Sequence, residues 1–190
     1  MNKDKFVIGL FGEKGSGKET FTELLKEILP NKKIQGVRTS AILMKTLKTW
    51  GLPDIRENYS KLVISMEQTF GAGSLARANK QLIDREEADI VVIDGIRRQP
   101  EVDLVKSFPR HCLLYLTADP KLRFARLKSR QEKENEKNMT FEGFLAEESL
   151  PTEQFIPQMG QEADYRIENN GQIERFKDQI KDFCQKFELV

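Results

Sequence analysis

The sequence has few of the residues from which several common sites are built. It contains two cysteines, Cys112 and Cys184, and one histidine, His111, in 190 residues. The cysteines lack the close spacing of metal ligands, and so few in a chain of this size predict reduced thiols rather than a disulfide framework. His111 stands at the entry to an apolar run and is interpreted as a strand-edge residue, which excludes a His-based triad and a His-rich metal site.

Long hydrophobic runs and an excess of one charge are also missing. No run approaches the length of a membrane span, and the apolar run in MNKDKFVIGLFG is too short for a signal peptide. With 31 Lys and Arg against 30 Asp and Glu, the net charge is +1, so no global field draws the chain to nucleic acid or to a membrane. We expect a cytoplasmic protein, monomeric or homodimeric, whose anion sites are built locally.

The length and the hydrophobic pattern indicate one compact domain with an α/β fold. Short apolar runs predict strands near 6–11, 33–37, 90–93, 112–117 and 165–168. Helical patterns lie between them, near 17–29, 40–50, 57–87 with a break at 71–74, 100–108, 120–130, 141–149 and 173–187. This alternation predicts three layers, with a central parallel sheet of about five strands and helices on both faces.

The stretch GEKGSGKET, between the first strand and the first helix, has the G-x-x-x-x-G-K pattern of a phosphate-binding loop. Glycines let backbone N–H groups converge on an anion, and the helix directs the positive end of its dipole at the same point. Lys18 would neutralise the β- and γ-phosphates of ATP and is the first candidate catalytic residue. The predicted ATP-binding residues of the loop are Gly12, Glu13, Lys14, Gly15, Ser16, Gly17, Lys18, Glu19 and Thr20.

Glu19 departs from this pattern, because a Ser or Thr hydroxyl usually follows the lysine and binds Mg²⁺. Three outcomes are open: Glu19 binds the ion directly, holds one of its waters, or disables the metal site. The water-mediated role is favoured because the second element of a metal site is also present. Asp94 ends the buried strand at 90–93, where phosphate-loop enzymes place an acidic residue that acts on Mg²⁺ through water.

Several segments together resemble the adenylate kinase-like nucleoside monophosphate kinases, in particular the branch with deoxynucleoside monophosphate kinases and dephospho-CoA kinases. The segments that carry the resemblance, in family order, are GEKGSGKET, RTSAILMK, VVIDGIRR, LRFARLKSR and ADYRIENNG. They span nearly the whole chain. The resemblance implies the P-loop NTPase fold, ATP with Mg²⁺ as cofactors, and transfer of a phosphoryl group to a second nucleotide.

The resemblance also implies an acceptor site, in a helical insertion at 38–87. Ser40 would match the threonine and Lys45 the arginine of the family's T-G-D-x-x-R segment, with Arg38 as an alternative to Lys45. In DGIRR, either Arg97 or Arg98 would clamp the acceptor phosphate, because a planar guanidinium suits that bidentate contact. We expect the other arginine of the pair to be nearly silent on substitution.

A lid is the third element that the resemblance implies, at 131–160. Arg123, Arg126 and Arg130 share one helix face, which is either a solvated basic face or the lid arginines that close over the transferring phosphoryl group. Of these, Arg126 and Arg130 are the candidate catalytic pair. The turn at Asn170 and Gly171 would reach the ATP adenine through its backbone, although Asn-Asn-Gly is also typical of a plain turn.

Three functions remain open from the sequence. The first is an ATP-dependent kinase of a (deoxy)nucleoside monophosphate. The second is a kinase of a hydroxyl, such as that of dephospho-CoA; such enzymes tend to place an aspartate after the second strand, where this chain reads GVRTS, so the first is favoured. The third is a nucleotide-binding protein with weak or no catalysis, in which Glu19 has spoiled the metal site.

Overall fold

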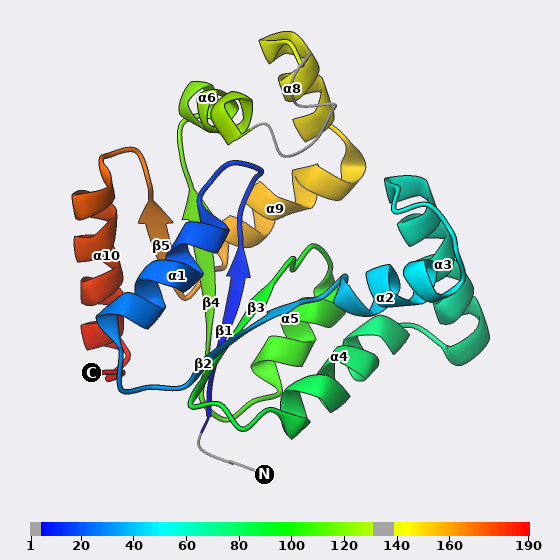
Figure 1. Cartoon of the computed structure of the whole chain (residues 1–190), viewed down its shortest axis with the longest axis horizontal. Helices are drawn as coiled ribbons and strands as arrows, with labels where there is room; N and C mark the ends of the chain where they lie inside the picture. Colours follow the sequence, from blue (N-terminus) through cyan, green and yellow to red (C-terminus); the bar gives the residue numbers. More distant parts are fainter. Residues whose placement is uncertain (1–4, 131–138) are drawn as a thin grey trace. The chain divides into compact units, whose positions relative to one another are not determined.

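The computed structural model describes residues 5–130 and 139–190, and its five strands form one parallel sheet in the order β2-β3-β1-β4-β5 (Figure 1). The register places Arg38 opposite Asp94, and Thr117 opposite Glu168. The predicted fold class is therefore confirmed, with the Asp94 strand next to the first strand. The strands are β1 (Phe6–Phe11), β2 (Ile34–Arg38), β3 (Ile90–Asp94), β4 (His111–Thr117) and β5 (Tyr165–Glu168).

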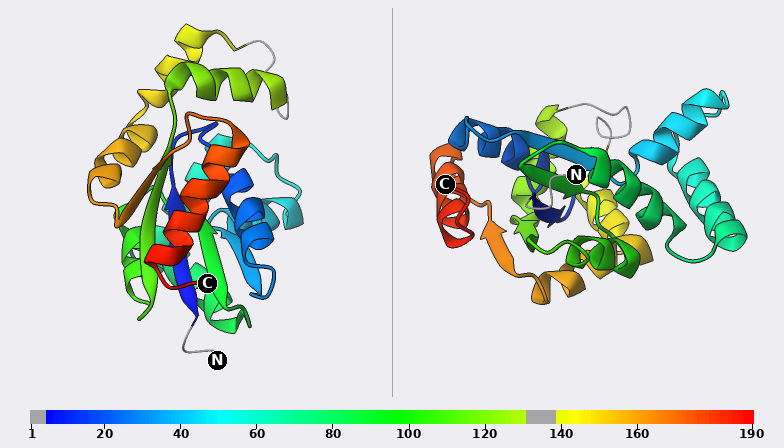
Figure 2. Two further views of the ribbon diagram at one scale, coloured as in Figure 1. Left: turned by 90° about the vertical axis from the view of Figure 1, so that its left-hand side faces the viewer. Right: turned by 90° about the horizontal axis from the view of Figure 1, so that it is seen from below.

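Helices lie on both faces of this sheet, and the described residues contain nine of them (Figure 2). They are α1 (Lys18–Ile28), α2 (Ala41–Thr49), α3 (Arg56–Phe70), α4 (Ser74–Arg85), α5 (Gln99–Lys106), α6 (Pro120–Arg130), α8 (Phe141–Glu148), α9 (Pro151–Gln161) and α10 (Ile173–Lys186). In the described part of the chain, no helix is both long and apolar enough to cross a membrane.

The chain divides into two compact units, which are described separately. The first comprises Met1–Gly9 and Lys33–Cys112, and the second comprises Leu10–Lys32 and Leu113–Val190. The phosphate-loop motif belongs to the second unit, whereas Asp94 and the DGIRR arginines belong to the first. The acceptor insertion at 38–87 and the lid at 131–160 remain proposals, and residues 131–138 of that lid lie outside the described part of the chain.

In the second unit, α10 packs beside α1 through aromatic side chains (Figure 1). The rings of Phe21 and Phe183 meet edge to face with centroids 5.9 Å apart, and both side chains are fully buried. Phe176 and Ile180 extend the same buried stripe along α10, at the spacing of an amphipathic helix. This packing fixes α1 and, with it, the loop from which α1 begins.

In the first unit, the α3–α4 junction forms where the sequence predicted a break. Gly71 and Gly73 have φ angles of 86° and 72°, a left-handed conformation that glycine adopts without steric cost. The far end of α4 is closed by the buried Lys5, whose Nζ donates to the carbonyl oxygens of Ile83 and Glu86 at 2.7 Å each. A cation at a helix C-terminus is favourable, so Lys5 stabilises the end of α4.

The sequence did not predict α9, because two prolines fall in it. Pro151 stands in the first turn, where a missing N–H costs nothing, but Pro157 lies inside the helix. Buried Ile156 and Met159 and the close approach of Gly160 to the Tyr115 ring show how the helix is held. A Cβ on Gly160 would lie 2.5 Å from that ring, which shows how closely α9 packs against β4. This packing offsets the helical hydrogen bond that Pro157 cannot donate.

Candidate functional site

The loop of residues 12–20 connects β1 to α1, and its three glycines leave backbone groups without side chains beside them. The N-cap of α1 is Gly17, with a φ of 103°, and it makes no side-chain capping hydrogen bond to the first helical turn. A Cβ on Gly17 would lie 2.6 Å from the Asn169 amide nitrogen, and a Cβ on Gly12 would lie 1.9 Å from the carbonyl oxygen of Leu116. Only glycine fits at both places, because Leu116 and Asn169 pack directly against the loop backbone. The glycine loop held in this way, which we call the glycine cradle, ends at the N-terminus of α1, where backbone N–H groups suit a phosphate group.

Lys18 folds back over this loop. Its Nζ donates hydrogen bonds to the carbonyl oxygens of Gly12 at 2.7 Å and Glu13 at 3.0 Å. The ammonium group therefore lies over the backbone that the pattern assigns to the phosphates. Inside the loop, the buried Ser16 Oγ has no hydrogen-bond partner among the described residues, and it is a polar atom available to a ligand.

The two residues after Gly12 tie the loop to other elements of the second unit. Glu13 accepts a hydrogen bond from the Tyr115 hydroxyl on β4, and Lys14 pairs with Glu147 on α8. Burial, together with the bond to Glu13, raises the pKa of Tyr115 to about 12. The phenol therefore keeps its proton at neutral pH and donates to Glu13 throughout the physiological range.

Arg126 reaches the loop from α6, where the sequence placed a lid arginine. Its guanidinium donates to the carbonyl oxygen of Asn169 at 2.9 Å and that of Gly15 at 3.5 Å, the second at the limit of a hydrogen bond. Burial lowers the pKa of Arg126. The structure does not describe the side chain of Arg130, so the catalytic role predicted for it stays a prediction.

Arg123, the third arginine of this face, is buried and serves to hold α8. Its guanidinium pairs with both carboxylate oxygens of Glu148, one at 3.0 Å, and its Nε donates to the carbonyl oxygen of Ala118 at 2.8 Å. It also lies over the Phe144 ring, 5.4 Å from the centroid. Lys14 of the phosphate loop also pairs with α8, through Glu147. Because α8 lies within the expected lid at 131–160, the described part of that lid contacts the phosphate loop.

We predict that Glu148→Gln destabilises the protein, because it leaves the guanidinium of Arg123, only 4% exposed, without its anionic partner. Loss of such a charged hydrogen-bonded pair costs about 2 kcal/mol of unfolding free energy, or about 4–8 °C in Tm. Thermal denaturation measures the change, with Glu142→Gln on the exposed side of the same helix as the control. Equal Tm values for the two variants would contradict the structural role of this pair.

In the first unit, β3 ends in Asp94 within a set of polar contacts. The backbone N–H of Thr39 donates to the Asp94 carbonyl oxygen at 3.0 Å, and the Thr39 hydroxyl donates to the Gly95 carbonyl oxygen at 3.0 Å. The side-chain Oδ1 of Asp94 is buried and has no hydrogen-bond partner among the described residues. An unpaired carboxylate oxygen suits a hard cation or a water that the cation holds, so Asp94 fits a Mg²⁺ site.

The two DGIRR arginines differ in their burial, because Arg98 is half-buried and Arg97 is exposed. Arg98 donates to Glu67 on α3 at 2.9 Å and to Glu101 on α5 at 2.7 Å. Burial by itself would lower the pKa of Arg98, but the hydrogen bonds and charges of Glu101 and Glu67 outweigh it and raise the pKa. Arg97 is exposed, as are the other predicted acceptor residues, Arg38 at the end of β2, Ser40 at the N-cap of α2 and Lys45.

Glu19 and the adenine-side turn complete the predicted set. Glu19 is exposed in the first turn of α1, one residue before the half-buried Thr20. Asn170 accepts a hydrogen bond at 2.7 Å from the backbone N–H of Asp119, which precedes α6, and Gly171 packs against Arg175. The residue before them, Asn169, contacts the phosphate loop through Ser16. The sequence analysis did not identify this contact, because the Asn-Asn-Gly pattern alone is typical of a turn.

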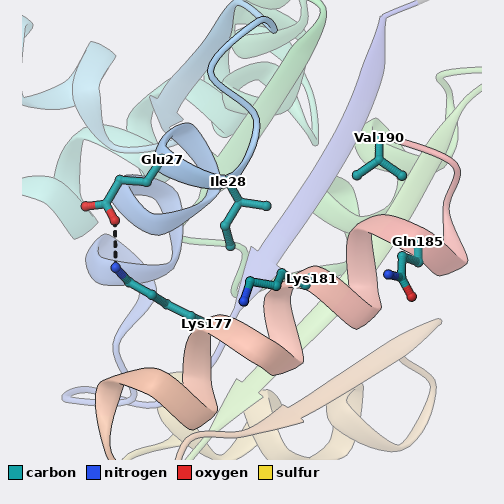
Figure 3. A pocket seen from close by; sticks show the side chains of 6 residues that line it. All are labelled: Glu27, Ile28, Lys177, Lys181, Gln185 and Val190. Atoms are coloured by element: carbon teal, nitrogen blue, oxygen red, sulfur yellow. Dashed lines mark hydrogen bonds and ion pairs between the residues drawn. The ribbon is translucent and has the colours of Figure 1, made fainter.

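A separate pocket of about 430 Å³ lies between α1 and α10 (Figure 3). Figure 3 shows Glu27 and Lys177 facing each other across it, 2.9 Å apart, with Ile28, Lys181, Gln185 and Val190 as the other lining residues. It opens at the C-terminal end of α1, whereas the phosphate loop is at the N-terminal end, about 15 Å away along the helix. The pocket is therefore not the predicted ATP site.

Comparisons with known proteins agree with this architecture. A family model described as an AAA domain matches residues 8–149. A protein of Sulfurisphaera tokodaii named UPF0200 protein is 27% identical over 180 residues, which cover 95% of this chain and 96% of the relative.

Two solved structures show the same fold. A shikimate kinase from Bacteroides thetaiotaomicron superposes with a TM-score of 0.61 at 12% identity, covering 96% of this chain and 98% of its own. A gluconokinase from Sinorhizobium meliloti superposes with a TM-score of 0.58 at 10% identity, covering 100% and 98%. The P-loop kinase fold that the sequence predicted is thus confirmed.

Proposed function

We propose that this chain, which belongs to the AAA domain family, is an ATP-dependent phosphotransferase whose acceptor is a (deoxy)nucleoside monophosphate. The observation that carries the proposal is the phosphate loop with its glycine cradle and with Lys18 folded over it. Phosphoryl transfer requires mainly positioning and charge neutralisation, and this loop supplies both for a triphosphate.

In this proposal the second unit holds ATP. The backbone of residues 12–20 binds the phosphates, Lys18 neutralises the migrating charge, and Arg126 and Arg130 act from the lid side at 131–160. The backbone at Asn170 and Gly171 faces the adenine. Glu19 and Asp94 are the residues that would hold Mg²⁺, which when bound would neutralise the phosphate oxygens.

The first unit would supply the acceptor site, within the insertion at 38–87 and the DGIRR segment. Arg97 would bind the acceptor phosphate, with Arg38, Ser40 and Lys45 around the acceptor. The end of β2 offers the Thr39 hydroxyl, which already donates to the Gly95 carbonyl oxygen, and no carboxylate follows it. A phosphate acceptor needs no general base, so this arrangement favours a nucleoside monophosphate over a hydroxyl.

A second candidate function is phosphorylation of a hydroxyl. The similarity to a shikimate kinase and a gluconokinase favours it, since both names denote kinases of acceptors that are not nucleotides. Dephospho-CoA is the acceptor of this class that the family resemblance suggests. A nucleotide-binding protein with weak or no catalysis is the third candidate, because Glu19 stands where a hydroxyl ligand is usual.

One assay separates the candidates. The purified chain is incubated with Mg²⁺ and ATP and with a panel of ribo- and deoxynucleoside monophosphates, dephospho-CoA, shikimate and gluconate, and ADP formation is measured. Turnover with a monophosphate that exceeds the acceptor-free rate supports the proposal, and turnover only with a hydroxyl acceptor supports the second candidate. ATP binding without turnover on any acceptor supports the third.

Glu19 gives a prediction about the metal. If Glu19 holds Mg²⁺ through a water, Glu19→Ala should raise the Mg²⁺ concentration at half-maximal rate by roughly tenfold or more, with little change in Tm. Glu19→Ser restores the usual hydroxyl ligand and should keep activity. Glu23→Ala, an exposed glutamate one turn further along α1, is the control.

The opposite outcome has a clear meaning. A negative charge in the first turn favours the helix dipole, so Glu19 could act only on α1. Glu19→Ala would then lower Tm and leave the Mg²⁺ titration unchanged. If the natural chain shows no Mg²⁺-dependent turnover while Glu19→Ser does, the glutamate has disabled the site.

We also expect the protein to act in the cytoplasm as a monomer or homodimer, with nucleotides rather than nucleic acid or membranes as its partners. Both cysteines are buried, and burial raises the pKa of Cys184 to about 11, so that thiol is unreactive. Size-exclusion chromatography with light scattering determines the oligomeric state.

A further inference from the structure

Asn169 follows β5 directly, and its backbone is held at the end of the sheet. The backbone N–H donates to the Thr117 carbonyl oxygen on β4 at 2.8 Å, and the residue is only 6% exposed. A buried side-chain amide has to be hydrogen-bonded or it destabilises the fold. The partners of this amide lie on the phosphate loop and on α6, far from Asn169 in the sequence.

These partners determine the orientation of the Asn169 side-chain amide. Its Nδ2 donates to the Ser16 carbonyl oxygen at 2.9 Å, and its Oδ1 accepts from Arg126 Nη2 at 3.3 Å. A carbonyl can only accept and a guanidinium can only donate, so nitrogen faces the loop and oxygen faces the arginine. The missing Cβ of Gly17 leaves the space that the amide fills.

This contact also sets the direction of the next N–H group. The Ser16 carbonyl and the Gly17 N–H belong to one planar trans peptide, in which the two groups point in opposite directions. Because Asn169 holds the Ser16 oxygen toward itself, the Gly17 N–H points away from Asn169. That N–H opens the run of donors at the start of α1.

We propose that Asn169 is a positioning residue for phosphate binding: its amide fixes the Ser16–Gly17 peptide so that the Gly17 N–H faces the β-phosphate of ATP. The same amide orients Arg126, which also donates to the Gly15 carbonyl oxygen. The inference rests on the proposed ATP site in the loop. It assigns Asn169 to the phosphates, whereas the neighbouring Asn170 and Gly171 face the adenine.

The test measures the affinity of Asn169→Ala and Asn169→Asp for Mg²⁺-ATP and for tripolyphosphate by calorimetry, with Tm measured in parallel. Asn169→Ala should raise both dissociation constants by on the order of tenfold, since one net hydrogen bond that preorganises the loop is lost. Asn169→Asp should raise them further, because it keeps the size but places a negative charge beside the Ser16 carbonyl and the phosphates.

Gln179→Ala is the matched control, because Gln179 also donates an amide hydrogen bond to a backbone carbonyl at the end of β5, that of Glu168 at 3.3 Å. It should leave both affinities unchanged. Loss of ATP affinity with tripolyphosphate binding intact would assign Asn169 to the adenine and overturn the proposal. Lower Tm with both affinities unchanged would reduce Asn169 to a structural role and overturn it as well.

Measurements on the natural chain distinguish a failure of the kinase proposal from a failure of the inference about Asn169. Binding of ATP and tripolyphosphate without turnover contradicts the kinase proposal, and the affinities of the variants still support or overturn the role of Asn169. If the natural chain binds neither ligand, the ATP site and the role of Asn169 are both wrong.

Discussion

Lys18→Ala is expected to reduce phosphoryl transfer by roughly 10²–10³-fold or more while the protein stays folded. Of the two lysines in the loop, Lys14 is paired with Glu147 on α8, whereas the Lys18 ammonium group lies over the loop backbone. A charge placed where negative charge develops contributes several kcal/mol in a site that excludes water. The bonds of Lys18 to Gly12 and Glu13 stabilise the loop as well, but their loss costs only about 1–2 kcal/mol.

The measurement combines steady-state kinetics with circular dichroism and thermal denaturation. Lys26→Ala is the control, because Lys26 is an exposed lysine further along the same helix. It should change neither rate nor fold. If Lys18→Ala turns over ATP at nearly the natural rate, the loop is not the catalytic site, and the glycine cradle must have another purpose.

The fold was predictable from the sequence because its strands are short, buried and apolar. All six residues of β1 and the first four of β3 are buried, and such runs bounded by glycine or charge are recognised without tertiary information. The helix α9 was not predictable, since Pro157 argues against a helix there. Its stability depends on contacts such as that between Gly160 and Tyr115, which are 45 residues apart in the chain.

The candidate site was predictable to a similar extent. The glycines and Lys18 are adjacent in sequence, so a local pattern is enough to identify the cradle. Asn169 lies 153 positions from Ser16, and nothing in the turn Asn-Asn-Gly marks its contact with the loop. The sequence predicted that one of the two neighbouring arginines binds the acceptor phosphate, but it could not tell which one. The reason is the same, because Arg98 is paired with Glu67, which lies 31 residues earlier.

Those arginines carry the last prediction. Arg97→Ala should raise the KM for the acceptor and lower kcat together, with kcat/KM falling by roughly 10²-fold, because an arginine that binds a phosphate contributes in both the ground state and the transition state. Tm should change little, since Arg97 is exposed. The KM for ATP should stay near its natural value, because the ATP contacts belong to the second unit.

Arg98→Ala should show the opposite pattern. It leaves Glu101, whose side chain is 3% exposed, with a buried carboxylate that has lost its partner, and it also releases Glu67. The cost is about 1–3 kcal/mol, reduced from that of a fully buried pair because the Arg98 side chain itself is 37% exposed. Acceptor KM should be unchanged at temperatures where the variant is folded.

A double variant sharpens the contrast. In Arg98→Ala, adding Glu101→Gln removes the unpaired charge and should restore part of the lost stability, whereas Glu101→Gln in the Arg97→Ala background should restore nothing. Equal kinetics for Arg97→Ala and Arg98→Ala, both near those of the natural chain, would remove the acceptor clamp from the DGIRR segment. The acceptor phosphate would then have to be bound by the cations of β2 and α2, Arg38 and Lys45.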